Sequence, residues 1–289
     1  MIKCIASDMD GTLLNSTQTI SEENKEAILK AQAQGIEFVV ATGRSYQEAT
    51  YVLAEAGLKC PVIGVNGAEV RSKDGEVLAA TPISKELARK VAAKLVEKDV
   101  YFEVYTDKGA YTIDADKAVS ILVDIVVSAN PEANVKEIVE AAGARIRDGL
   151  IHTVEDYEIL FASDDYQIYK FLAFDFDADK LEEANESLAE LDNLAVSTSG
   201  HENLEITNKN AQKGIALASF VEAKGIELSE TMAIGDNFND VSMFEAAGRS
   251  VAMGNAGSYI KSLCDAVTAT NNEHGVAKAI LEVLLNDIN

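Results

Sequence analysis

The sequence has no tryptophan and only three prolines and three cysteines in 289 residues. Cys4, Cys60 and Cys264 lie far apart and form no CxxC pair, so neither a disulfide framework nor a zinc knuckle is indicated. Free cysteine is usually a small buried apolar side chain, and we expect that role for all three.

Positive charge is scarce as well. The 25 lysines and arginines are outnumbered by 48 aspartates and glutamates, which gives a formal net charge of -23 at pH 7. A surface with this excess of negative charge repels a nucleic-acid backbone and an anionic membrane. We therefore expect neither nucleic acid nor a membrane as a partner.

Long hydrophobic runs are absent too. The longest apolar stretch, residues 119–129, is interrupted by Asp124 and is too short to span a bilayer. The chain reaches Asp8 after a short apolar run, which leaves no room for the hydrophobic region of a signal peptide. These features predict a cytoplasmic protein.

What the sequence does contain is typical of a globular protein. Hydrophobic residues make up 47% and charged residues 25% of a chain long enough for two domains. Short apolar runs alternate with longer segments of helical periodicity, which favours a parallel sheet with crossover helices. Six apolar runs are predicted strands: 2–6, 37–41, 61–65, 231–235, 250–253 and 265–269.

Two segments near the start of the chain are predicted helices. Residues 21–35 and 45–57 each begin at a serine that can cap a helix, and each ends at a glycine. Ser45 and Glu48 have the spacing of a capping box, in which each side chain bonds the other residue's backbone N–H.

The middle of the chain has a different pattern, in which helical periodicity accompanies alternating strands. Helices are expected at 84–99 and 177–192, and strands at 101–113 and 166–176. We therefore predict a second, smaller α/β domain at 83–200. Residues 1–82 and 201–289 then form one discontinuous core domain, a Rossmann-like doubly wound parallel sheet.

Polar side chains follow four of the predicted core strands. In open α/β sheets, ligands bind beyond the carboxyl ends of the strands, so these four clusters should lie on one edge of the sheet. The clusters are Asp8 with Asp10, Thr42-Gly43-Arg44, Asn66-Gly67, and the segment 235–240.

The chemistry of these clusters points to a metal ion and a phosphoryl group. Asp8, Asp236 and Asp240 supply the hard oxygen ligands that suit Mg²⁺. Thr42 and the Gly43 backbone precede a helix start and offer hydrogen-bond donors to an anion. Lys213 can bring a positive charge to the same edge.

Four segments of the chain resemble the motifs of the haloacid dehalogenase-like phosphatases. They are "DMDGTLL" at 8–14, "ATGR" at 41–44, the Lys213-Gly214 pair, and "GDNFND" at 235–240. The position of the inserted domain and the segments "VNGA", "LEIT" and "AMGNA" are similar to the Cof-like branch, which carries a class IIB cap. The resemblance implies that the domain at 83–200 is this α/β cap domain and that it sets substrate specificity.

The resemblance implies a role for each of these residues. Asp8 is the expected nucleophile, which attacks phosphorus and forms an aspartyl-phosphate. Asp10 is the expected acid and base, and its main-chain carbonyl is expected at the metal. The remaining roles are phosphate binding by Thr42, Gly43, Lys213 and Asn239, and Mg²⁺ binding by Asp236 and Asp240. Arg44 and Asn66 follow strand ends and are candidate substrate contacts.

The acid role requires Asp10 to carry a proton at the start of the reaction. The formal charges of the three remaining carboxylates, a divalent cation and Lys213 then cancel, so an incoming phosphate meets a neutral pocket. Crowded carboxylates raise one another's pKa, which favours such a proton somewhere in the cluster. Separate roles for Asp8 and Asp10 also require the chain to bend at or just before Gly11.

The leading hypothesis is a Mg²⁺-dependent phosphatase that acts on small phosphorylated metabolites, such as sugar phosphates or phosphorylated cofactors. A phosphomutase is the alternative enzyme, because related mutases resemble the pattern at Asp8 and Asp10. A catalytically idle sensor of a phosphorylated ligand is the alternative from another class. The sequence is compatible with a monomer or a small homo-oligomer.

Overall fold

The computed structural model describes residues 1–129, 134–198 and 202–286. The chain forms two compact units. We call Met1–Thr81 with Asn210–Asn289 the core unit, and Pro82–Lys209 the inserted unit. The predicted boundary between 200 and 201 is therefore wrong by one strand. Asn203–Asn208 forms β11, which pairs with strands of the inserted unit rather than with the core sheet.

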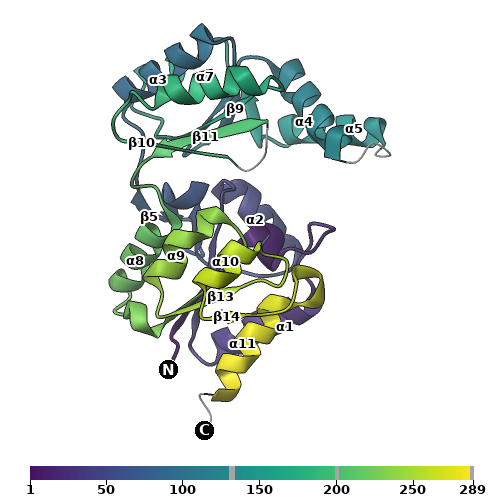
Figure 1. Cartoon of the computed structure of the whole chain (residues 1–289), viewed down its shortest axis with the longest axis vertical. Coiled ribbons are helices and arrows are strands. Elements are labelled where there is room, and N and C mark those ends of the chain that lie inside the picture. The colour runs from purple at the N-terminus through teal and green to yellow at the C-terminus, as the bar shows by residue number, and fades with distance from the viewer. Residues whose placement is uncertain (130–133, 199–201, 287–289) are drawn as a thin grey trace. The chain divides into compact units, whose positions relative to one another are not determined.

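The core unit, coloured purple to blue and green to yellow in Figure 1, is built on one eight-stranded sheet. Its strand order is β14-β13-β12-β1-β2-β3-β4-β5. The strands are β1 (Cys4–Ser7), β2 (Glu37–Ala41), β3 (Val62–Gly64), β4 (Glu69–Arg71), β5 (Val77–Ala80), β12 (Thr231–Gly235), β13 (Arg249–Ala252) and β14 (Ala266–Val267). All pairs from β14 to β3 are parallel. The strand order reverses between β1 and β12, which is where such sheets bind ligands.

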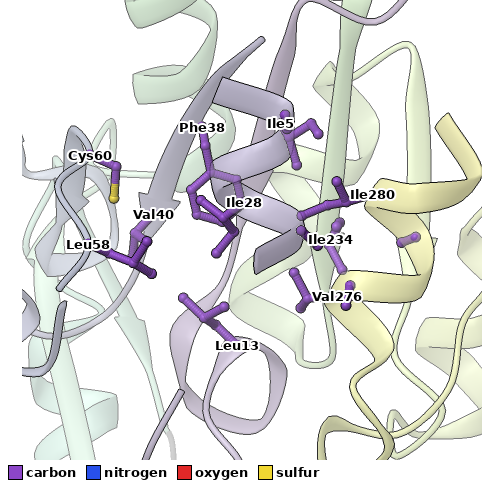
Figure 2. Close-up of a cluster of buried hydrophobic side chains, with 14 of the residues drawn as sticks. Ile5, Leu13, Ile28, Phe38, Val40, Leu58, Cys60, Ile234, Val276 and Ile280 are labelled. Atoms are coloured by element: carbon purple, nitrogen blue, oxygen red, sulfur yellow. The ribbon is translucent and has the colours of Figure 1, made fainter. Parts of the chain in front are cut away.

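Helices cover both faces of this sheet because its strands are apolar on both sides. Along β1, Ile5 packs into one hydrophobic cluster, while Cys4 and Ala6 pack into the other. Figure 2 shows part of the first cluster. The helices on that side are α1 (Glu22–Ala33), α2 (Tyr46–Glu55) and α11 (Gly275–Asn286). The opposite side carries α8 (Lys213–Ala223), α9 (Val241–Ala246) and α10 (Ser258–Leu263).

The predicted core elements are confirmed, because all six apolar runs contain strands and both predicted helices are present. The Ser21 hydroxyl accepts a hydrogen bond from Asn24 N at the start of α1. At the start of α2, Ser45 and Glu48 form the predicted capping box. The sequence reasoning missed the antiparallel strands β4 and β5 at the sheet edge.

The inserted unit has a six-stranded, mostly antiparallel sheet in the order β10-β11-β9-β6-β7-β8. Its strands are β6 (Tyr101–Thr106), β7 (Gly109–Thr112), β8 (Ile151–Thr153), β9 (Ile168–Phe174), β10 (Leu194–Ser197) and β11. Its helices are α3 (Lys85–Glu97), α4 (Ala115–Ala129), α5 (Val135–Arg147), α6 (Glu158–Ala162) and α7 (Ala178–Leu188). The patterns at 84–99 and 177–192 correspond to α3 and α7, whereas α4 and α5 were not predicted.

Apolar periodicity also explains how α3 and α7 lie on the inserted sheet. Val91 and Leu95 of α3 and Leu181 of α7 pack with Val104 and Phe171 in one buried cluster. In the described part of the chain, no helix is long and apolar enough to cross a membrane. Residues 119–129, the longest apolar run, lie within α4.

The cysteines behave largely as expected from their apolar character. Cys4 and Cys60 are buried in the core unit, and Cys264 is partly exposed. Burial raises the pKa of the Cys4 and Cys60 thiols to about 12, so both remain protonated at neutral pH.

Candidate active site

The candidate site begins where β1 ends. Ser7 is the last residue of the strand, and Asp8 follows it with its side chain buried. The backbone N–H of Asp8 still donates to Ile234 O of the neighbouring β12, so the position of Asp8 is set by the parallel sheet. This places Asp8 at the point where the strand order reverses.

The chain turns sharply after Asp8, as expected if Asp8 and Asp10 have separate roles. Met9–Leu13 forms one irregular helical turn in which Asp10 and Gly11 depart from helical geometry. Gly11 has φ 76°, and a Cβ at this position would lie 2.5 Å from Asp236 Oδ2. A glycine is needed here both for the left-handed backbone and for the close approach of Asp236. The predicted bend is therefore confirmed.

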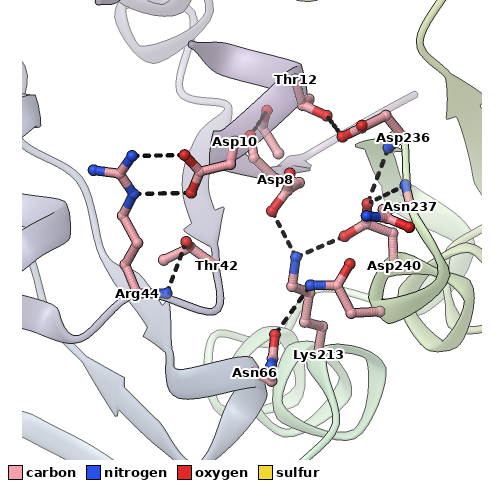
Figure 3. A network of polar contacts seen from close by, with 12 residues as sticks. Asp8, Asp10, Thr12, Thr42, Arg44, Asn66, Lys213, Asp236, Asn237 and Asp240 are labelled. Carbon is pink, nitrogen blue, oxygen red and sulfur yellow. Dashed lines mark hydrogen bonds and ion pairs between the residues drawn. The ribbon is translucent and has the colours of Figure 1, made fainter. Parts of the chain in front are cut away.

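The bend separates the two carboxylates that the sequence sets two residues apart. The Asp8 side chain points toward Lys213, whereas the Asp10 side chain is 48% exposed and faces Arg44 (Figure 3). Arg44 holds Asp10 in a bidentate pair, with Nε 2.8 Å from Oδ2 and Nη2 2.6 Å from Oδ1. The same Nη2 donates to Gln18 Oε1 at 2.7 Å.

This arrangement changes the expectation for Asp10. The sequence predicted a protonated Asp10 within the crowded carboxylates, but its side chain lies outside the three-carboxylate group and against a guanidinium. The role of Asp10 as acid and base, and that of its main-chain carbonyl at a metal, stay predictions.

Lys213 lies at the centre of the site. It is the first residue of α8 and is fully buried. Its Nζ donates to Asp8 Oδ1 and to Asp240 Oδ1, each at 2.6 Å (Figure 3). A buried ammonium of this kind is tolerated only with such charged partners. The sequence predicts Lys213 at this edge of the sheet, and in the structure it contacts Asp8, the expected nucleophile.

The loop after β12 supplies two further carboxylates. Asp240 Oδ2 accepts hydrogen bonds from the backbone N–H groups of Asp236 and Asn237, at 2.9 and 3.0 Å. Asp236 Oδ1 accepts a hydrogen bond from the Thr12 hydroxyl at 2.7 Å. The segment 236–240 is therefore a hydrogen-bonded turn that holds both carboxylates beside Asp8.

Burial and crowding shift the titration of these groups. Burial raises the pKa of Asp8 well above its usual range and the Asp240 carboxylate adds to the rise, while the Lys213 ammonium opposes it. Burial also raises the pKa of Asp236. Burial disfavours the charged form of Lys213, but Asp240 and Asp8 more than compensate, so its pKa lies above the ordinary value. By formal charge, three carboxylates face one lysine, so negative charge is left uncompensated when all three are ionised.

The three carboxylates fit a hard divalent cation. Asp8, Asp236 and Asp240 each offer an oxygen, and these atoms lie within 4.8 Å of one another. The donor set contains neither thiolate nor imidazole, and Mg²⁺ prefers carboxylate oxygens and water. A divalent cation would also balance the negative charge that Lys213 leaves uncompensated.

The other phosphate-binding candidates lie on the loops after β2 and β12, and the substrate-contact candidate Asn66 lies on the loop after β3. The buried Thr42 hydroxyl accepts a hydrogen bond from Arg44 N at 3.1 Å. Asn239 Nδ2 donates to Asn66 Oδ1 at 3.1 Å, which links the loop after β12 to the loop after β3. The ideal Cβ position of Gly43 lies 3.2 Å from the same Asn66 oxygen. The structure thus brings all of these predicted residues to one edge of the sheet.

The loop after β3 has an uncommon backbone. Val65 and Asn66 both have positive φ, 50° and 55°. This conformation is costly for a β-branched residue and tends to occur at functional sites. Hydrogen bonds from Val65 N to Arg44 O and from Asn66 N to Thr42 O hold it in place.

Sequence reasoning missed three residues that organise the site. Thr12 orients Asp236, Gln18 holds Arg44, and the Asn255 amide donates to Gly11 O at 2.8 Å. Thr12 and Asn255 lie inside the quoted segments "DMDGTLL" and "AMGNA", so the sequence carried a signal for both. Gln18 lies in a polar loop with no such signal.

Comparison with known proteins supports the interpretation of this site. Residues 5–280 match the family model described as haloacid dehalogenase-like hydrolase. The chain is 38% identical to Phosphatase YwpJ of Bacillus subtilis over 98% of this chain and all of that protein. It is 37% identical to the 5-amino-6-(5-phospho-D-ribitylamino)uracil phosphatase YwtE of the same organism, over 98% of each chain.

A solved structure shows the same fold. The haloacid dehalogenase-like hydrolase from B. subtilis superimposes with a TM-score of 0.84 at 38% identity, covering 96% of this chain and 99% of that one. The family match spans nearly the whole chain, and the relatives are matched along their full length. This chain therefore belongs to the haloacid dehalogenase-like hydrolase family and is a phosphatase of its Cof-like branch.

Proposed function

We propose that this phosphatase uses Mg²⁺ and hydrolyses small phosphorylated metabolites through an aspartyl-phosphate on Asp8. The observation that carries the proposal is the position of Asp8 at the end of β1, 2.6 Å from a buried Lys213 and within a group of three carboxylates. A carboxylate is a weak nucleophile that repels phosphate, so such a site needs concentrated positive charge around it.

The first half of the reaction takes place at Asp8. One carboxylate oxygen forms a bond to phosphorus while the bond from phosphorus to the leaving oxygen breaks. Lys213 fixes the orientation of the carboxylate and reduces its repulsion of the incoming phosphate. Covalent catalysis of this kind divides one difficult displacement into two easier steps.

Asp10 is the proposed proton carrier for both steps. It gives a proton to the departing alkoxide, and it then takes a proton from the water that attacks the aspartyl-phosphate. This second attack releases inorganic phosphate and restores the Asp8 carboxylate. In the described conformation Asp10 is bound to Arg44, so we infer that it must leave this partner before it can donate.

The loops after β2 and β12 are proposed to bind the phosphoryl oxygens of the substrate. Thr42 Oγ1, the Gly43 backbone and the Asn239 amide are the proposed donors, together with Lys213, which contacts Asp8. Fixed donors around the equatorial oxygens stabilise the charge of a phosphoryl transition state without reorganisation.

Asp8, Asp236 and Asp240 are the proposed side-chain ligands of Mg²⁺, with the Asp10 carbonyl as a main-chain ligand. When bound, the cation supplies charge neutralisation and polarises the phosphoryl group. Support comes from the donor chemistry of the cluster and from its excess negative charge.

The inserted unit is the proposed specificity domain. One face of its sheet buries charged and aromatic groups: Lys170 Nζ lies 3.4 Å from Glu205 Oε2 and 4.5 Å from the Tyr105 ring centroid. A buried ion pair of this kind often contributes no more stability than apolar residues of similar volume, which favours a functional reason for its presence. The relative YwtE is named for a phosphorylated ribitylaminouracil, and we propose a substrate of similar size, a sugar phosphate or a phosphorylated cofactor.

The test is phosphate release from a panel of phosphorylated metabolites, with Mg²⁺ and with EDTA. We expect release only with Mg²⁺, and a loss of at least about a thousandfold in kcat for Asp8→Asn because the covalent step is removed. Asp74→Asn, in an exposed turn of the core unit, is the control and should keep full activity.

Two outcomes would contradict the proposal. Near wild-type hydrolysis of an aryl phosphate by Asp8→Asn would show that Asp8 is not the nucleophile. Turnover that requires a sugar bisphosphate as activator, without net phosphate release, would indicate a phosphomutase instead.

A further inference from the structure

Two exposed aromatic rings lie stacked at the edge of the core unit. Phe238 and Tyr259 have ring centroids 5.8 Å apart and an angle of 21° between their planes. The two residues are 68% and 59% exposed. Most large apolar residues of the core unit are buried, so a paired aromatic surface open to solvent is unusual in this part of the chain.

The pair lies on the same edge of the sheet as the candidate site. Phe238 follows β12 and is two residues beyond Asp236, while Tyr259 is in α10, which follows the adjacent strand β13. The loop between β13 and α10 is tied to the turn after Asp8, because the Asn255 amide donates to Gly11 O at 2.8 Å. Phe238 thus lies in the same turn as two of the three carboxylates, and Tyr259 follows a loop that is bonded to the turn after the third.

Both rings are carried by well-fixed backbone. Asn237 Oδ1 accepts a hydrogen bond from Phe238 N at 2.8 Å, within the turn that Asp240 also caps. In α10, Ile260 is buried, and Lys261 Nζ donates to Gly254 O at 2.6 Å. A rigid support lowers the entropy that a binding surface loses when a ligand docks.

We propose that Phe238 and Tyr259 bind the leaving group of the substrate, and that this group contains a planar aromatic or heteroaromatic ring. The inference rests on the proposed phosphatase reaction and adds a substrate class to it. Because the two rings stack on each other and both remain largely exposed, the outer face of a ring is a flat apolar surface on which a planar ring can extend the stack. A puckered sugar ring covers less of such a surface, and the phosphate end is held separately at Asp8 and Lys213.

The experiment compares two kinds of phosphate monoester in steady-state assays with Mg²⁺. Pyridoxal 5′-phosphate and a nucleoside 5′-monophosphate carry a planar ring, whereas glucose 6-phosphate and glycerol 3-phosphate do not. In the wild type, we expect kcat/KM to be higher for the ring-bearing esters. Phe238→Ala and Tyr259→Ala should each lower kcat/KM about tenfold for those esters, through KM, and leave the other two unchanged.

Matched variants separate stacking from other effects. Tyr51 of α2 is a similarly exposed aromatic residue of the core unit, at 60%, and Tyr51→Ala should leave kcat/KM unchanged for every substrate. Tyr259→Phe keeps the ring and should retain wild-type kcat/KM, whereas Phe238→Leu keeps apolar area without a ring and should lose most of the preference.

The possible failures are distinguishable. An equal fall in kcat/KM for all four esters would mean that the aromatic pair acts on a step common to every substrate. Unchanged kcat/KM in both alanine variants would mean that the rings do not contact the substrate. Either result overturns the inference and leaves the proposed phosphatase reaction standing. Absence of phosphate release from any ester would instead refute the proposed function, and the inference with it.

Discussion

Replacing Lys213 by methionine tests the electrostatic account of the site directly. Lys213 is fully buried and contacts Asp8 and Asp240, both of which are buried as well. Methionine fills a similar volume without the charge, so the two carboxylates would face each other uncompensated. Removing one partner of a buried ion pair costs about 3–5 kcal/mol of stability, and we expect the free energy of unfolding of the core unit to fall by that amount at pH 8.

The loss should depend on pH. Burial raises the pKa of Asp8 in the folded state, so a proton on this carboxyl stabilises the fold below the unfolded pKa of about 3.9. That contribution is lost as the pH rises through the folded pKa. Without Lys213 the folded pKa of Asp8 rises further, and the variant should therefore lose less stability at pH 5 than at pH 8.

The assay is urea unfolding of both proteins, followed by far-ultraviolet circular dichroism at the two pH values. Lys224→Met is a matched control, because Lys224 follows the same helix but pairs with Glu37 at the surface, with its side chain 36% exposed. Surface pairs contribute less than about 1 kcal/mol. The reasoning would be refuted if Lys213→Met lowered the free energy of unfolding as little as the control does, or by the same amount at both pH values.

Two further predictions concern the carboxylate group and the turn beside it. Mg²⁺ at a hundred times its dissociation constant should stabilise the folded core by about 2.7 kcal/mol, seen as a rise in Tm that EDTA reverses and that Asp236→Asn abolishes; an unchanged Tm in the wild type would count against a metal at this site. Gly11→Ala should destabilise the protein by roughly 1–2 kcal/mol through its positive φ, and should also reduce activity by displacing Asp236. Gly35→Ala has the same backbone strain at φ 81° with open space around the Cβ, so it should lose stability but keep activity; equal activity in the two variants would contradict the role of Gly11.

Local sequence determined the elements of the core unit. The apolar runs form strands because their side chains alternate between two buried faces, as Phe38 and Val39 of β2 do. Capping residues placed the helix starts, and the bend at Gly11 followed from the need to separate two neighbouring carboxylates. These features depend on residues close in the chain.

Local sequence patterns gave wrong predictions where pairing between strands distant in the chain decides the structure. The boundary near 200 was misplaced because β11 joins the inserted sheet through pairing with β9, some thirty residues earlier in the chain. The helix α4 was not predicted because most of its large apolar residues are valine and isoleucine, whose β-branched side chains locally favour a strand.

The same division holds within the site. Sequence alone identified Asp8, Asp236, Asp240 and Lys213 as one chemical group, because the carboxyl ends of parallel strands meet at one edge of a sheet. Only the tertiary structure decided that Lys213 bridges Asp8 and Asp240, that Arg44 holds Asp10 outside the carboxylate cluster, and that Phe238 stacks on Tyr259. Side-chain partners across loops depend on the exact turn geometry after each strand, and no local pattern encodes the distance between two loops that the sequence separates by tens or hundreds of residues.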